Sequence, residues 1–158
     1  MHSTRHKQLQ SGFTLLEVMI TLVIVSIITA IAYPSYVNNV TRARRAEMRG
    51  LLSENAQFME RFFTENNSYT LDLAGVAPAL PVTKSPRTAV GTSVMYNISI
   101  VPPTALTPAN PNTFTLQAVP VNTMAADPCV TYTVNSLGQK NNVGTLTGGM
   151  TIDTCWSK

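Results

Sequence analysis

Apolar residues divide the chain into a continuous apolar stretch near its start, an amphipathic stretch after it, and alternating segments towards its end. From residue 13 to residue 32 every residue is apolar except Thr14, Glu17, Thr21, Ser26 and Thr29. Twenty such residues in a helix are about long enough to cross the roughly 30 Å core of a bilayer. Short hydroxyl side chains are tolerated there because they bond to their own helix. The stretch therefore predicts a membrane-spanning helix.

The amphipathic stretch continues this helix. From Val37 to Phe63, apolar residues recur at three- and four-residue spacing, with charged residues between them. Pro34 lies inside the pattern, so we expect a kink or local melting there. The helix is predicted to run from residue 13 to residue 65 and to end at residues 66–68, a length of about 80 Å at 1.5 Å per residue. Its first half is apolar all round and needs lipid or other copies of itself as neighbours.

The rest of the chain predicts a small sheet. Prolines and glycines make residues 70–93 irregular. Strand patterns follow at residues 94–101, 114–119 and 130–134, with a weaker one at 139–143. In the first of these strands Tyr96, Ile98 and Ile100 share one face. Short strands joined by turns favour an antiparallel meander, whose apolar face would cover the back half of the helix. The fold class is therefore α+β, a head on a helical stalk.

Composition narrows the function classes only a little. Charged residues make up 12% of the chain, against roughly 25% in an average soluble domain. The net charge is +3, but Arg5 and Lys7 supply two of these charges from the first dozen residues. The basic balance is therefore weak evidence for nucleic-acid binding.

Two cysteines, Cys129 and Cys155, lie in the last thirty residues. With no histidine near them they do not complete a four-ligand zinc site, so a single disulfide is the simpler interpretation. A disulfide implies an oxidising compartment, and closing a loop of 25 intervening residues contributes roughly 3 kcal/mol in the chain-entropy model.

The basic residues before the apolar stretch indicate its orientation, because positive charge before an apolar span keeps that end in the cytoplasm. The alternative is an ordinary secretory signal peptide, which would have an A-x-A-like cleavage site after the apolar run. The run instead leads into Tyr33-Pro34-Ser35-Tyr36 and a helical pattern.

The stretch Gly12-Phe13-Thr14-Leu15-Leu16-Glu17, with its short basic leader and a proline near the end of the apolar run, resembles the processing motif of type IV pilins and related pseudopilins. The resemblance implies that a membrane prepilin peptidase cuts between Gly12 and Phe13 and that Phe13 becomes N-methylated. Residues 1–12 would then be a cleaved leader. Residues 13–34 would be the transmembrane or filament-core helix, residues 35–66 the amphipathic helix of the head, and residues 67–158 its loop and sheet.

Glu17 is the one carboxylate in the apolar stretch. An isolated acid inside a membrane is costly and by default marks a function. After cleavage, the new ammonium of Phe13 would lie one helical turn away. In a filament, Glu17 would instead pair with the ammonium of a neighbouring copy and so set the register between subunits, as a single buried polar residue does in a coiled coil. The alternative is that Glu17 sits near the headgroups without a partner.

The C-terminal part resembles the disulfide-closed region of type IV pilins, and its ending Asp153-Thr154-Cys155-Trp156 resembles minor pilins of the PilE-like kind. The resemblance implies a minor subunit of a type IV pilus that acts in pilus assembly and in twitching motility or adhesion. Its expected partners are other pilin subunits, the prepilin peptidase and the inner-membrane assembly machinery. It would be a single-pass inner-membrane protein with a periplasmic head before assembly, and lie at the cell surface afterwards.

Two other functions stay open. Some minor pilins of this layout are DNA receptors in natural transformation, although the head offers few cations for phosphate: Lys84, Arg87, Lys140 and Lys158. A type II secretion pseudopilin is the third possibility.

No catalytic residue, cofactor or metal is expected, and we do not expect an enzyme. His2 and His6 would leave with the leader, and there is no phosphate loop or nucleophile motif. Asp127 and Asp153 offer one metal possibility, a weak calcium site near the disulfide. The basic residues from Arg42 to Arg45 are expected on a solvated helix face, with contact to anionic headgroups or partner subunits as the alternative.

Overall fold

The computed structural model describes residues 12–102 and 110–157. The helix α1 spans Leu15–Asn66 and is followed by five strands, two 3-10 turns and a short C-terminal helix. The later elements are β1 Lys84–Ser85, η1 Gly91–Ser93, β2 Tyr96–Ile100, β3 Thr115–Pro120, η2 Asn122–Met124, β4 Thr131–Asn135, β5 Lys140–Val143 and α2 Ile152–Ser157.

The long helix agrees with the apolar pattern. α1 begins two residues later and ends one residue later than predicted, and it stays helical through Pro34, so the expected local melting is wrong there. The expected kink at Pro34 stays a prediction. Asn67 ends the helix in the left-handed conformation, with φ of 52°, and its N–H donates to the Phe63 carbonyl at 2.7 Å.

The chain divides into two compact units at the boundary between Asn39 and Val40. In the first unit, the described residues of α1 are exposed, and among the described helices α1 is the one that is long and apolar enough to span a membrane. The second unit starts at Val40, five residues after the predicted start of the head, and the predicted domain bounds stay predictions. Below, the described residues of this second unit are called the head.

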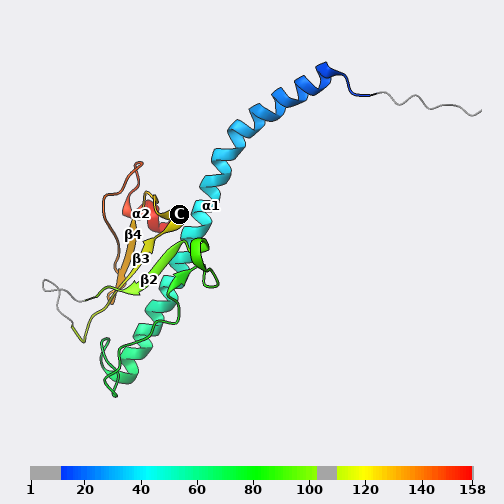
Figure 1. Cartoon of the computed structure of the whole chain (residues 1–158). Coiled ribbons are helices and arrows are strands. Elements are labelled where there is room, and N and C mark those ends of the chain that lie inside the picture. Colours follow the sequence, from blue (N-terminus) through cyan, green and yellow to red (C-terminus); the bar gives the residue numbers. More distant parts are fainter. Residues whose placement is uncertain (1–11, 103–109, 158) are drawn as a thin grey trace, which may run out of the picture. The chain divides into compact units, whose positions relative to one another are not determined.

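The sheet of the head is an antiparallel meander. Its strand order is β1-β2-β3-β4-β5, and every neighbouring pair is antiparallel, as the sequence predicted. Figure 1 shows β2, β3 and β4 beside the part of α1 that belongs to the head. Each register pair places its two side chains on the same face, so Ile98, Ala118 and Tyr132 form one row across the sheet.

The core lies between α1 and one face of this sheet. Met48, Leu52 and Met59 are at most 1% exposed and pack on the inward side chains of the strands. Their spacing keeps them on one face of the helix. The inward strand residues are Tyr96, Ile98, Leu116, Ala118, Tyr132 and Val134. The predicted cover of the back half of the helix by the apolar sheet face is therefore confirmed.

The segment between α1 and β2 is tied to the helix by one buried amide. Asn55 is fully buried, its Nδ2 donates to the Val82 carbonyl at 2.7 Å, and its Oδ1 accepts the Val82 N–H at 3.2 Å. Both ends of this side chain are satisfied, which offsets the cost of burying it. Tyr69 closes the end of the core, stacking on Phe63 and meeting Phe114 edge-on.

The structure contains elements that the sequence patterns did not predict. β1 and η1 lie inside residues 70–93, so the expectation of a wholly irregular segment is wrong there. α2 was also missed, although a helix-start signal precedes it: Thr151 Oγ1 accepts the Thr154 N–H at 3.2 Å, and Asp153 lies in the first turn. Its brevity and the two preceding glycines hid this signal.

Candidate functional site

The start of α1 places Glu17 in a defined local geometry. The Thr14 Oγ1 accepts the Glu17 N–H at 3.2 Å, and Glu17 lies in the first helical turn. Thr14 and Glu17 thus have the spacing of a capping box, and a carboxylate there also suits the positive end of the helix dipole. Within the described residues Glu17 forms no ion pair, and its side chain is exposed. Its charge therefore has no partner in this part of the chain.

The other polar residues of the apolar half are satisfied by their own helix. Thr21 donates to the Val18 carbonyl at 2.8 Å, Ser26 to the Val23 carbonyl at 2.7 Å, and Thr29 to the Val25 carbonyl at 2.8 Å. Back-bonding of this kind removes the cost of a hydroxyl in lipid, as predicted. It sets Glu17 apart as the polar group that the helix itself does not neutralise.

The cleavage site lies at the edge of the described region. Gly12 and Phe13 precede the helix, and Phe13 is 82% exposed. Residues 1–11 of the predicted leader lie outside the described residues. Cleavage after Gly12 and methylation of Phe13 stay predictions.

A buried ion pair joins α1 to the C-terminal part of the head. The Arg45 Nε donates to Asp127 Oδ2 at 3.2 Å and its second guanidinium nitrogen to Oδ1 at 2.5 Å, with the two side chains 6% and 0% exposed. The Tyr96 hydroxyl donates to the same carboxylate. The expectation that Arg45 lies on a solvated face is therefore wrong, because α1 turns this residue into the sheet.

The charges of this pair stabilise each other. Burial by itself would lower the pKa of the Arg45 guanidinium, but its hydrogen bond to Asp127 and the carboxylate charge outweigh burial and raise it. Burial, followed by the hydrogen bond to Asp127, raises the pKa of Tyr96. Burial and the nearby carboxylate raise that of Tyr132. Arg45 is thus held charged and both phenols neutral beneath the sheet.

The disulfide lies next to this cluster. Cys129 and Cys155 are joined, both fully buried, with Cα atoms 5.7 Å apart, as the sequence predicted. The calcium possibility at Asp127 and Asp153 is not supported, because Asp127 is occupied by Arg45 and Tyr96. Among the described residues, no group of three or more His, Cys, Asp or Glu side chains is placed to hold a metal ion.

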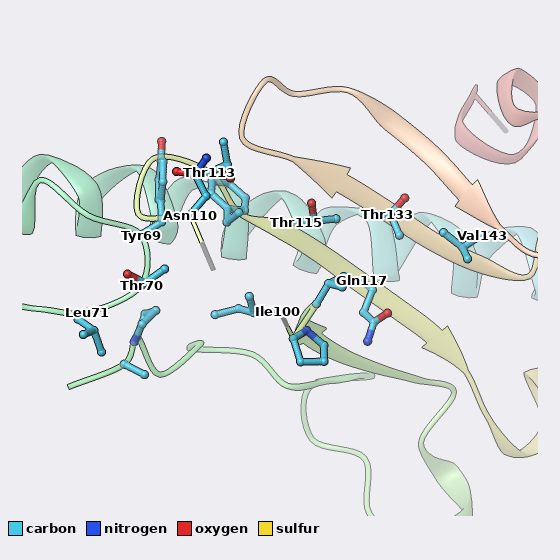
Figure 2. Close-up of a pocket in the computed structure, with 15 residues that line it drawn as sticks. Tyr69, Thr70, Leu71, Ile100, Asn110, Thr113, Thr115, Gln117, Thr133 and Val143 are labelled. Carbon is cyan, nitrogen blue, oxygen red and sulfur yellow. The ribbon is translucent and has the colours of Figure 1, made fainter. Parts of the chain in front are cut away.

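A hollow of about 780 Å³ opens on the face of the sheet that points away from α1 (Figure 2). Hydroxyl and amide groups of Thr115, Gln117 and Thr133 line it from the strands, and Leu71 and Pro78 line it from the loop after α1. None of the described residues that line it carries a charge. A second hollow of about 490 Å³ shares Thr115 and Thr133 and reaches Lys140. The periodic pattern predicted a polar outward face but no hollow.

The predicted DNA-contacting cations are scattered. Arg87 forms an ion pair with Glu54 on the helix, and the Lys140 ammonium lies 5.5 Å from the centre of the Trp156 ring. Lys84 pairs in register with Asn97, which places it on the outward face of the sheet. Lys158 lies outside the described residues. Its three described members, Lys84, Arg87 and Lys140, therefore form no common basic patch.

Comparison with known proteins identifies the class. A model of the prokaryotic N-terminal methylation motif matches residues 7–33, and the family model described as type IV minor pilin ComP, DNA uptake sequence receptor, matches residues 34–133. The first unit and the head together are thus those of a type IV pilin. The chain belongs to the type IV minor pilin family of ComP, the DNA uptake sequence receptor.

Individual relatives are similar over shorter stretches. The fimbrial protein EcpC of Eikenella corrodens is 33% identical over 76 residues, which cover 48% of this chain and 50% of EcpC. The major component of the type IV wide pilus of Thermus thermophilus is 32% identical over 65 residues, or 41% of this chain and 50% of that protein. The chain therefore spans about half the length of these relatives.

Two solved structures are similar in arrangement. The minor pilin PilV of Neisseria meningitidis has a TM-score of 0.46 at 24% identity, covering 70% of this chain and 93% of PilV. A type IV pilin of Shewanella oneidensis has a TM-score of 0.40 at 25% identity, covering 67% of this chain and 96% of that one.

Proposed function

We propose that the protein is a minor structural subunit of a type IV pilus. The peptidase removes residues 1–12, Phe13 is methylated, and α1 holds the chain in the inner membrane with the head in the periplasm. The assembly machinery then moves the subunit into the filament, where it supports twitching motility or adhesion. One observation carries this proposal: the apolar half of α1 is exposed over its described length and contains one carboxylate, Glu17, that is not neutralised there.

The same observation gives the assembly step a mechanism. An apolar helix face needs lipid before assembly and other pilin helices afterwards. The Phe13 ammonium that cleavage creates supplies the positive charge that Glu17 lacks. Pairing between neighbouring copies is favourable at one axial offset only, because only there does Glu17 meet the ammonium of another copy; elsewhere it has only the ammonium of its own chain, one helical turn away. The role of the chain itself is structural, and the enzymatic steps, cleavage and methylation, are carried out on it by other proteins.

Mass spectrometry of pili sheared from cells tests this proposal. We expect the chain to begin at Phe13, to be heavier by one methyl group than the unmodified sequence, and to be much less abundant than the main subunit. A chain that begins at Met1, or one absent from the sheared fraction of piliated cells, would contradict it. A secretion defect with normal pili in a deletion strain would instead support a type II secretion pseudopilin.

A second function, DNA reception, is favoured by the family model that matches residues 34–133. The outward hollow adds hydroxyl and amide groups suited to hydrogen bonds with base edges, and its described lining residues include no carboxylate to repel phosphate. Lys84 on the same face, and Lys140 at the second hollow, are the cations available for phosphate contact. Two cations allow about two phosphate contacts, so this binding would rest mainly on the hydrogen bonds of the hollow.

Binding of labelled duplex DNA to the full chain in detergent micelles, measured against salt, tests this second function. Two phosphate contacts predict a shallow slope of about −2 in log K against log salt, and Lys84→Ala should reduce its magnitude by about one. Arg61→Gln is the matched control, since it removes an exposed charge from the helix. Binding that is undetectable at low salt, or equal losses in both variants, would remove the hollow from consideration.

A further inference from the structure

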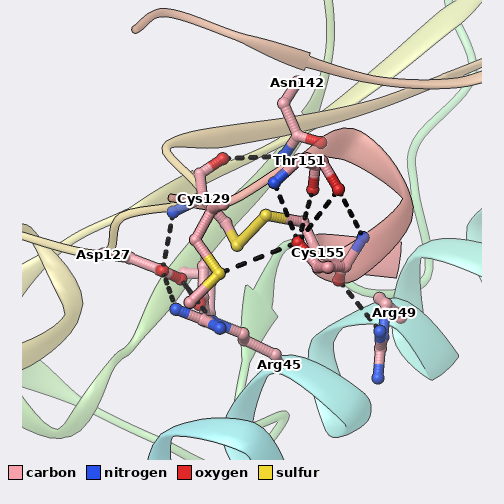
Figure 3. Close-up of polar contacts among 10 residues, drawn as sticks. Arg45, Arg49, Asp127, Cys129, Asn142, Thr151 and Cys155 are labelled. Carbon is pink, nitrogen blue, oxygen red and sulfur yellow. Dashed lines mark hydrogen bonds and ion pairs between the residues drawn. A yellow bond between two sulfur atoms is a disulfide. The ribbon is translucent and has the colours of Figure 1, made fainter. Parts of the chain in front are cut away.

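Two arginines on α1 contact the two ends of the disulfide-closed loop. Arg45 holds Asp127, which lies two residues before Cys129, and Arg49 donates to the Cys155 carbonyl oxygen at 2.9 Å. The arginines are four residues apart and so project from the same side of the helix. Figure 3 shows both of them beneath the disulfide. One turn of α1 therefore holds both cysteine segments through contacts that do not involve sulfur.

The contacts continue from these arginines to the cysteine backbones. The Asp127 carboxylate that pairs with Arg45 also accepts the Cys129 N–H, at 3.0 Å. The Cys129 carbonyl accepts a bond from Asn142 Nδ2 at 2.7 Å, and the Cys155 N–H donates to the Thr151 carbonyl at 3.0 Å. The backbone N–H and the backbone carbonyl of each cysteine are thus both hydrogen-bonded.

The conformation next to Cys129 needs such support. Val130 has φ of 50°, in the left-handed region that a β-branched residue rarely adopts. A strained residue of this kind persists only when its surroundings hold it in place. Its N–H donates to the Asp127 backbone carbonyl at 2.9 Å, while the Asp127 carboxylate, held by Arg45, accepts the N–H of the preceding residue, Cys129. The path of the chain through Cys129 therefore depends on a contact with α1.

We propose that Arg45 and Arg49 are positioning residues for the disulfide, which closes on a head whose helix has already docked. In this order of events, the helix and the sheet pack first. The arginines then bring the two thiols within bonding distance. The bond then locks the docked loop. The sulfur chemistry is ordinary thiol–disulfide exchange.

The exchange needs an external disulfide, either oxidised glutathione or a thiol–disulfide oxidoreductase. One cysteine thiolate attacks that disulfide, forms a mixed disulfide with one of its sulfurs, and releases the other sulfur as a thiol. The second cysteine thiolate then attacks the mixed disulfide and releases the sulfur bound there as a second thiol. Two protons leave the protein thiols, two electrons pass to the oxidant, and the oxidant becomes two thiols. The arginines affect only the second, intramolecular step, because that step depends on how closely the two thiols are held.

The test measures the effective concentration of one thiol at the other in the full chain in detergent micelles. The protein is equilibrated with mixtures of reduced and oxidised glutathione, alkylated, and analysed by mass spectrometry. We expect Arg49→Gln to lower the effective concentration about tenfold, as the loss of one hydrogen bond to a charged group implies. Arg49→Lys should recover much of it, because an ammonium still donates to the Cys155 carbonyl.

Two further variants separate positioning from stability. Asp127→Asn should lower the effective concentration at least as much as Arg49→Gln. Met59→Ala destabilises the same core from farther along α1 and should leave it unchanged while the head stays folded, which protease resistance of the reduced protein establishes. The proposal fails if Arg49→Gln leaves the effective concentration at the wild-type value, or if Met59→Ala lowers it equally. Where Asp127→Asn does not fold, the comparison of Arg49→Gln with Arg49→Lys decides.

Discussion

Replacing Glu17 with glutamine is expected to exclude the protein from assembled pili while leaving it processed and in the membrane. Glutamine keeps the length of the side chain and still suits the capping position opposite Thr14, so the start of α1 is preserved. Only the charge is removed. If Glu17 pairs with the amino terminus of a neighbouring subunit, the variant leaves an uncompensated ammonium between packed helices. We expect the amount of the variant in sheared pili to fall by at least tenfold, because a cost of roughly 1.4 kcal/mol already changes an equilibrium tenfold.

The measurement is quantitative mass spectrometry of sheared pili and of the membrane fraction from the same cells. Ser26→Ala is the matched control. It removes a polar group from the same apolar half of the helix, but this hydroxyl is already hydrogen-bonded to the helix backbone. A Glu17→Gln chain that still begins at Phe13 would show that assembly, and not cleavage, has failed. Wild-type amounts of the variant in pili would show that the carboxylate has no role in register.

The stalk was readable from the sequence because its signals are local. A stretch of twenty mostly apolar residues, a proline after it and the amphipathic pattern that follows all lie within one continuous part of the chain. The strands were readable for the same reason, since Tyr96 and Ile98 alternate with exposed Asn97 and Ser99. What these patterns do not contain is the contact between segments far apart in the sequence.

Arg45 lies at a buried position of the three- and four-residue pattern, but its charge led to the opposite prediction. The buried positions of α1 are Arg45, Met48, Leu52, Asn55 and Met59, and they share the three- and four-residue spacing of one face. Arg45, at one of these positions, was expected on a solvated face because arginine is seldom fully buried. The partner of Arg45 is 82 positions away. The available signal was that Arg45 has the same three- and four-residue spacing as the apolar residues of this face. Such a position predicts burial.

The outward hollow and α2 could not be predicted for a different reason. The hollow depends on where the loop after α1 lies against the strands, and alternation says nothing of loop positions. Thr133, on the outward face, is only 7% exposed, which a period-2 pattern does not predict. The helix α2 is six residues long, and its position depends on the disulfide and on Arg49. Tertiary contacts decide such short elements.

Replacing Arg45 with methionine is expected to destabilise the head by about 3–5 kcal/mol, because it leaves the Asp127 charge buried without its partner. The free energy of unfolding, from denaturant titration of the full chain in detergent followed by circular dichroism, measures this. Arg42→Gln is the matched control, since Arg42 is exposed on the same turn and its loss should cost no more than about 0.5 kcal/mol.

The double variant Arg45→Met/Asp127→Leu distinguishes two causes of the destabilisation: the unpaired charge of Asp127 and the loss of its hydrogen bonds. An apolar pair of similar volume often matches a buried ion pair in stability, so the double variant should recover part of the loss. It still leaves the Tyr96 hydroxyl and the Cys129 N–H without their acceptor, which costs about 1–3 kcal/mol for each unsatisfied group. Recovery should therefore be partial. A double variant no more stable than Arg45→Met alone would mean that the hydrogen bonds of Asp127, and not its charge, hold the C-terminal part of the head to α1.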